Sequence, residues 1–146
     1  MKNKKELEND FEWWITCIPD KIERLEELIP PSIFSQLDYS LQSLNILGNY
    51  IIEKIQTVSN LKNEQELWDC IASYVGTCYR RNVPTAKWRV ELEDKNNLFY
   101  GVPALRTDAM TNFYPKYEIT TMLDRKRADF LYAITKKHNE LQRDSI

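Results

Sequence analysis

The sequence predicts an α+β fold, in which an N-terminal helical half packs with a small antiparallel sheet of two to three strands and a C-terminal helix. The prediction depends on a change of period within one stretch of the chain. Between residues 66 and 81 apolar side chains recur every three to four positions, as on one face of a helix. Residues 86–93 instead alternate apolar and charged side chains, as in a half-buried strand. A helix therefore leads into a strand, with Asn82-Val83-Pro84 as the break between them.

Length and composition predict that residues 1–146 form one domain. A chain of 146 residues buries roughly 68–70% of the surface of its unfolded state, which is enough for a core without disulfides or metals. The charged share of 29% and the hydrophobic share of 42% are typical of a soluble globular protein. With only three glycines and six prolines, the chain shows no flexible linker, and no internal repeat divides it.

The first two helices are predicted from apolar stripes and their end signals. The first stripe stops at Pro19. Asp20 and Glu23 then have the spacing of a capping box, which predicts the start of a second, short helix. That helix should end at Pro30-Pro31, where the next one can begin.

The third helix, beginning at Pro31 or Ser32, is expected to be the longest, because a broad apolar stripe continues over about six turns from Leu37 to Val58. Gly48 lies in the middle of it and costs up to about 1 kcal/mol relative to alanine, which a close crossing of another backbone segment can offset. Asn63 and Glu66 form another cap-like pair, which predicts a fourth helix over residues 64–81.

The C-terminal half begins with the sheet. After the predicted strand 86–93, the polar run 94–97 is typical of a hairpin turn, and residues 98–105 return as a second strand. Pro103 cannot donate a ladder hydrogen bond, which favours an edge position or the end of the strand. A loop or a short third strand near residues 113–117 follows.

Two helices complete the prediction. One covers about residues 118–123, and Asp124 can cap the final helix. Five side chains of the final helix share one face and should pack on the core: Phe130, Leu131, Ile134, His138 and Leu141.

Cysteine usage and the N-terminus predict a soluble cytoplasmic protein. Cys17, Cys70 and Cys78 are odd in number and lie in apolar periodic segments without a CxxC pair, so we interpret them as buried thiols in a reducing compartment. The first 14 residues are charged and lack the apolar run of a signal peptide. No stretch of about 18 apolar residues occurs, which excludes a membrane span.

The net charge of −2 is unevenly distributed along the chain. Residues 1–73 carry 7 Lys/Arg and 13 Asp/Glu, a net charge of −6, whereas residues 74–146 carry a net charge of +4. Such an asymmetry can give two faces opposite electrostatic potentials, which steer partners, although solvated helix faces that differ by chance give the same count.

No pattern in the sequence predicts a catalytic residue, a metal site or a cofactor. His138 is the only histidine and lies on the apolar stripe of the last helix, where a histidine is most often a hydrogen-bonded edge-of-core residue. Cys70 and Cys78 lie eight positions apart on one helix and point in directions about 80° apart. The three isolated glycines form no phosphate-binding loop.

The basic clusters are better functional candidates. Arg80-Arg81, Lys87 and Arg89 can share one side of the helix–strand unit, and Arg125–Arg127 with Lys136-Lys137 form a second group. Together with nearby aromatic residues they could bind nucleic acid by charge and stacking. Acidic residues interleave with the cations, however, and the dipole of a helix by itself favours cations at the helix C-terminus. Nucleic-acid binding is therefore not the favoured hypothesis.

The aromatic residues are the remaining signal, because four Trp and eight Tyr exceed what packing usually requires. Trp13 and Trp14 point about 100° apart on a helix, so one should belong to the core and the other to its rim. Trp, Tyr and Arg are enriched at the energetic centres of interfaces. The predicted partner-binding residues are Trp13, Trp14, Tyr79, Arg80, Arg81, Arg89 and Tyr100.

One series of motifs resembles a family of small uncharacterised bacterial α+β domains, some of which lie beside toxin genes as immunity-like proteins. The motifs are Tyr74-Val75-Gly76, Arg80-Arg81, Trp88, Gly101-Val102-Pro103 and Asp129-Phe130-Leu131-Tyr132. The resemblance covers about residues 65–135. Thr77 stands where that family has an acidic residue. The resemblance implies an immunity-type role and defines no functional residue.

These observations favour a non-enzymatic domain that binds another protein, with inhibition of a bacterial toxin as its specific form. The acidic helical half, with an exposed Trp, would then meet a basic partner. Two alternatives stay open. One is a small enzyme whose pocket lies between the sheet and the 64–81 helix, with Tyr79, Arg80, Arg89 and Tyr100 as ligands. The other is nucleic-acid binding by the basic half. The sequence leaves the partner and the oligomeric state open.

Overall fold

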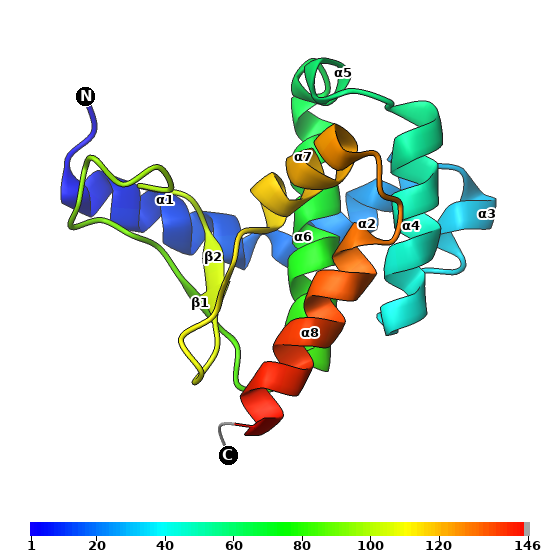
Figure 1. The fold of residues 1–146 in the computed structure, drawn as a ribbon. Coiled ribbons are helices and arrows are strands. Elements are labelled where there is room, and N and C mark those ends of the chain that lie inside the picture. The colour runs from blue at the N-terminus through cyan, green and yellow to red at the C-terminus, as the bar shows by residue number, and fades with distance from the viewer. Residues whose placement is uncertain (145–146) are drawn as a thin grey trace.

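The computed structural model describes residues 1–144, which form helices around one hydrophobic core and a three-stranded sheet at its side (Figure 1). This confirms the predicted α+β class. The elements are α1 Lys4–Thr16, α2 Ile18–Leu28, α3 Pro31–Phe34, α4 Leu41–Lys54, α5 Val58–Lys62, α6 Gln65–Asn82, β1 Lys87–Arg89, β2 Ala104–Arg106, β3 Asn112–Phe113, α7 Pro115–Arg125 and α8 Phe130–Asp144. No helix within residues 1–144 combines the length and the apolar character needed to cross a bilayer.

The long helix α6 forms the centre of the core. Of its 18 residues, 11 are buried, because α2, α4, α5, α7 and α8 all pack against it. Figure 1 shows α6 in the middle of this group, with α1 extending away from it on one side. A helix surrounded in this way is apolar over most of its circumference, which explains why its sequence signal is so strong.

The three strands form an antiparallel sheet in the order β1-β2-β3, so β1 and β3 are its edges. Lys87 faces Arg106, Trp88 faces Leu105 and Arg89 faces Ala104 in the register of β1 and β2. Pro103 directly precedes β2, which confirms that it lies at the end of a strand, although β2 is the central strand and not an edge.

Trp88 attaches the sheet to α6. Its indole lies so close to Gly76 that a Cβ at this position would be 2.8 Å from Cζ2 of Trp88 and 3.2 Å from Cγ of Pro115. Trp14 of α1 covers the same indole from another side, with the ring centroids 5.4 Å apart in an edge-to-face arrangement. A glycine is therefore required here by space and not by backbone conformation.

The predicted third helix is wrong as a single element, because two turns divide it into α3, α4 and α5. Tyr39 and Gln56 have positive φ angles of 67° and 73°, which no continuous helix allows. The carboxylate of Asp38 accepts hydrogen bonds from the N–H and the hydroxyl of Ser40, and Ser40 in turn caps α4. These polar side chains compete with helical hydrogen bonds. The longest helix is consequently α6.

The predicted caps also need correction. Pro19 lies in the first turn of α2 and does not end α1, so Asp20 is already inside the helix and caps nothing. Glu64, not Asn63, is the N-cap residue of α6, and its side chain makes no capping bond. Asp124 lies within α7, and the final helix begins six residues later at Phe130. Proline at the first helical positions explains the early start of α2, since its fixed φ suits a helix.

The first two strands of the sheet, β1 and β2, have three residues each and are shorter than the predicted strands 86–93 and 98–105. The turn over residues 94–97 is present, but a connection of residues 90–103 replaces the tight hairpin. The side chains of Asp94 and Asn97 accept hydrogen bonds from the N–H groups two residues further on, which curls the chain. Phe99 then stacks on Tyr114 with 3.9 Å between ring centroids, which takes it out of the strand. Of the predicted alternatives, a loop or a short third strand near residues 113–117, the strand is present as β3 but ends at Phe113, because α7 begins at Pro115.

The final helix buries the predicted face with one exception. Leu131 and His138 are buried on it as expected, and so are Thr135 and Gln142. Leu141, in contrast, is 40% exposed. The buried stripe of α8 therefore runs through two polar residues that an apolar pattern cannot identify.

Gly48 confirms the predicted close backbone crossing. A Cβ at this position would collide with the backbone carbonyl of Ala128, which lies in the connection between α7 and α8. Because a carbonyl of the main chain cannot move aside like a flexible side chain, Gly48→Ala should lower the free energy of unfolding by about 1–3 kcal/mol. The matched control is Asn49→Ala, an exposed position of the same helix, which should change stability by no more than about 0.5 kcal/mol. Chemical denaturation of the two variants measures the difference, and equal stabilities would contradict the crossing.

Candidate functional site

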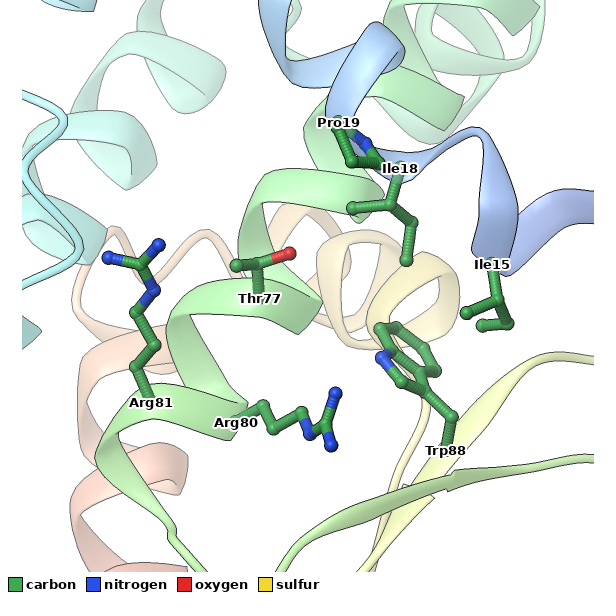
Figure 2. Close-up of a pocket in the computed structure, with 7 residues that line it drawn as sticks. All are labelled: Ile15, Ile18, Pro19, Thr77, Arg80, Arg81 and Trp88. Carbon is green, nitrogen blue, oxygen red and sulfur yellow. The ribbon is translucent and has the colours of Figure 1, made fainter.

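An open groove of about 440 Å³ lies where the elbow between α1 and α2, the C-terminal end of α6 and the edge strand β1 meet. It is lined by Ile15, Ile18, Pro19, Thr77, Arg80, Arg81 and Trp88. Figure 2 shows the aliphatic side chains of the elbow and the Trp88 indole on one side of the groove, with the arginine-bearing end of α6 opposite. We call this the elbow groove.

The apolar wall of the elbow groove is held rigidly. Trp88 is fixed between Gly76 and Trp14 as described above. Trp14 is fixed in turn, because its Nε1 donates a hydrogen bond of 2.8 Å to the carboxylate of Asp69 on α6, and Nζ of Lys21 lies 4.3 Å from the centre of its ring. A preformed apolar wall of this kind loses little side-chain entropy when a ligand covers it.

The two arginines of the elbow groove are free to bind an anion. Arg80 extends from α6 toward Trp88, whereas Arg81 points the other way (Figure 2) and lies over the Tyr39 ring at 3.8 Å. Among the side chains of residues 1–143 neither guanidinium has a carboxylate within 4.0 Å. Both side chains are exposed. Their position at the end of α6 also suits the helix dipole, which explains why cations are tolerated there without partners.

A second open groove of about 440 Å³ lies on the other side of β1, and Trp88 borders both grooves. We call it the sheet groove; it is lined by Thr85, Lys87, Trp88, Arg89, Arg106, Thr107, Asp108 and Met110. Lys87 and Arg106 face each other across β1 and β2, an arrangement that repels. Nε of Arg106 donates to the side chain of Asn112 at 3.1 Å, but none of the three cations forms an ion pair within the described residues.

The structure separates the two neighbouring tryptophans as predicted. Trp13 is 69% exposed, whereas Trp14 is partly buried against the core. Trp13 lines neither groove. Tyr100 also lies outside both grooves, in the long connection between β1 and β2, where it bridges to Glu91.

The prediction that Tyr79 belongs to a binding surface is wrong. Its side chain is fully buried, its hydroxyl lies 2.7 Å from Nδ1 of His138, and its ring stacks on Phe113 at 4.0 Å. The set of ligands predicted for an enzyme pocket is therefore not brought together, because Arg80 lines one groove and Arg89 the other. The stripe of α6 places Tyr79 on its inner face, one position before the exposed arginines.

Sequence reasoning missed the aliphatic wall and one of the cations. Ile15 and Ile18 belong to the apolar stripe that precedes Pro19, and nothing in the stripe shows that the turn between α1 and α2 brings both to the groove, Ile18 being otherwise buried. Arg106 lies in a segment with no clear period, and only the strand register places it beside Lys87. Only the pairing of β1 with β2 identifies Arg106 as a neighbour of Lys87.

Comparison with protein-family models, with curated proteins and with solved structures found no match to this chain. Among the described side chains, those of residues 1–143, no three His, Cys, Asp or Glu residues gather as metal ligands do. Cys70 and Cys78 are buried, and Cys17 is half-buried. Burial raises the pKa of the Cys78 thiol to about 11, so the thiol is protonated and a poor nucleophile at neutral pH.

The buried His138 should make stability depend on pH. Burial, with a smaller effect of Lys137, holds the pKa of its imidazole below the ordinary 6.5. The unfolded chain therefore binds a proton more readily than the folded one, so stability is complete above about pH 6.5 and is lost as the pH falls below it.

The test compares the free energy of unfolding of the native chain and of His138→Gln between pH 8 and pH 5, a range set by the ordinary histidine pKa of about 6.5. Glutamine keeps a polar group near the Tyr79 hydroxyl but does not titrate. Burial raises the pKa of the Glu118 carboxyl, and this effect cancels because both proteins contain it. The difference in the free energy of unfolding between the two proteins should be constant above pH 6.5. Below pH 6.5 the native chain should lose stability relative to His138→Gln. A difference that is flat over the whole range would contradict a buried neutral imidazole.

Proposed function

We propose that this chain is a non-enzymatic domain that binds another protein, and that the elbow groove and the sheet groove, with Trp88 between them, form its contact surface. The observation that supports the proposal most is the combination of a preformed aromatic and aliphatic wall with cations that form no ion pair among the described side chains. An apolar centre surrounded by polar and charged groups is the usual anatomy of a protein interface.

The residue types also fit a protein partner. Tryptophan and arginine dominate the energetic centres of interfaces, and here Trp88 and Arg80 line the same groove. The indole offers a large apolar area whose conformation is already fixed by Gly76 and Trp14. Each guanidinium can donate two parallel hydrogen bonds to one carboxylate of the partner, which fixes the orientation of the contact.

The alternative of a small enzyme receives less support from the geometry. The groups with chemical potential are engaged in packing: Tyr79 and His138 hold each other in the core, and burial raises the pKa of the Cys78 thiol. Both grooves are open and face solvent with long flexible cations, whereas acid–base chemistry needs a base positioned beside its substrate.

Inhibition of a bacterial toxin is the specific form of this function that the resemblance to immunity-like domains implies. The two grooves change the expected partner from a basic to an acidic one, since five cations line them against one carboxylate, that of Asp108. The positive electrostatic potential of this surface would speed the association of an inhibitor with an acidic face of a toxin. A toxin gene directly upstream would support this form, and a metabolic operon would contradict it.

Photo-crosslinking in cells tests the proposed surface. A benzophenone amino acid is placed at Thr77, inside the elbow groove, or at Ser59, an exposed position of α5 outside both grooves. We expect one discrete protein to be crosslinked from position 77 and not from position 59. The crosslinked protein is then identified and purified.

Affinity for that purified protein gives the second readout. The double variant Arg80→Glu with Arg81→Glu should weaken binding roughly tenfold or more, because it removes two anchors and adds repulsion. Lys136→Glu with Lys137→Glu, two exposed cations of α8, is the matched control and should bind like the native chain. Retention on a DNA column at low salt, lost steeply with added salt, would instead support nucleic-acid binding. That result together with no crosslink at position 77 would overturn the proposal.

A further inference from the structure

The edge strand β1 has an open hydrogen-bonding side. It pairs with β2 on one side only, and no backbone hydrogen bond joins residues 87–89 to any other segment within residues 1–144. In an antiparallel pair successive residues point their N–H and C=O groups alternately toward the partner strand and away from it. At least one residue of β1 therefore presents an unused donor and acceptor to its surroundings.

The two grooves lie on opposite faces of this open edge. Trp88 points its side chain to the face of α6 and the elbow groove, whereas Lys87 and Arg89, one residue away on either side, line the sheet groove. Successive side chains of any strand point to opposite faces. An added strand beside β1 would hence direct alternate side chains into the elbow groove and into the sheet groove.

We infer that an extended, acidic segment of the partner protein binds by adding a strand to the edge of β1. The inference rests on the proposed function and names the kind of segment that the surface takes. Side chains of one parity meet Ile15, Ile18 and Trp88 and are apolar. Side chains of the other parity meet Lys87, Arg89 and Arg106 and are acidic. Backbone hydrogen bonds supply affinity in this mode, and the alternate side-chain contacts supply specificity.

Charge complementarity selects this occupant. Lys87, Arg89 and Arg106 line the sheet groove and form no ion pair among the described side chains, and Asp108 is the one carboxylate that lines the groove with them. The excess of positive charge favours an anionic occupant. A second copy of this chain is a poor occupant, because two β1 strands paired about a two-fold axis would place Lys87 and Arg89 against the same cations of the other copy. Basic residues on an edge strand prevent such self-association.

The probe is a fluorescein-labelled peptide of nine residues in which glutamate alternates with valine, with both ends blocked. Binding is measured by fluorescence anisotropy at low salt. A peptide in which lysine replaces glutamate is the charge control, and an oligonucleotide of nine thymidines is the control for another polyanion. We expect the glutamate–valine peptide to bind and the lysine–valine peptide not to bind.

Backbone methylation distinguishes strand addition from simple charge attraction. One version of the peptide is N-methylated at every valine and another at every glutamate. In an antiparallel added strand whose glutamates face the cations, only one edge of the peptide can face β1, so one version should lose binding and the other should keep it. Amide hydrogen exchange at residues 87–89 should slow when the unmodified peptide is added.

Charge exchange tests which protein residues are involved. The double variant Lys87→Glu with Arg89→Glu should bind the glutamate–valine peptide roughly tenfold more weakly than the native chain does. It should also bind the lysine–valine peptide, which the native chain does not bind. The control Lys136→Glu with Lys137→Glu should keep the native preference. If Lys87 and Arg89 had only a structural role, replacing them would not change which of the two peptides binds more tightly.

Four outcomes would overturn the inference: no binding of the glutamate–valine peptide at millimolar concentration, equal binding of the two methylated peptides, no exchange of preference, or tighter binding of the oligonucleotide. If the crosslink at position 77 is nevertheless obtained, the protein-binding function stands and only the strand addition fails. If neither is obtained, both fail.

Discussion

The contact of Trp88 with Gly76 is the constraint on which the position of the sheet depends. The strands have only three, three and two residues, and a sheet this small needs an apolar face packed against a helix to be stable. Here the indole of the edge strand fits directly onto the backbone of the central helix. The same indole also contacts Trp14 and so packs against the C-terminal part of α1. One aromatic side chain thus joins the sheet, the core helix and the N-terminal helix, and the grooves on both sides of β1 exist because it is held there.

Much of the fold follows from local sequence signals, and the deviations have local causes. The period change around Asn82 locates both α6 and β1, since each element is set by the residues within it. The division of the third helix could not be predicted from an apolar stripe, because the turn at Asp38–Ser40 depends on polar side chains that bind their own backbone. The shortening of the second strand results from the stacking of Phe99 on Tyr114, a contact across the fold that no local period records.

The candidate site could be predicted only in part, for a similar reason. Arg80, Arg81 and Arg89 were identified because cations next to an apolar stripe are visible in a sequence. Tyr79 could not be placed correctly by residue type, since the tyrosine hydroxyl finds its partner in His138, 59 residues away. The separation of the cations into two grooves depends on the sheet register, which residue type and local periodicity do not specify.

The weak attachment of α1 has a consequence for the affinity of the elbow groove. None of the 13 residues of α1 is buried, so its docking depends on a few contacts, chiefly those of Trp14 with Trp88 and Asp69, which also hold the wall of the elbow groove in place. Ile15 forms part of the wall, and Trp14 covers Trp88. The groove is complete only in the fraction of molecules in which α1 is docked, and the observed dissociation constant is the intrinsic one divided by that fraction. Substitutions along α1 that touch no ligand therefore change the apparent affinity through the population of the docked state.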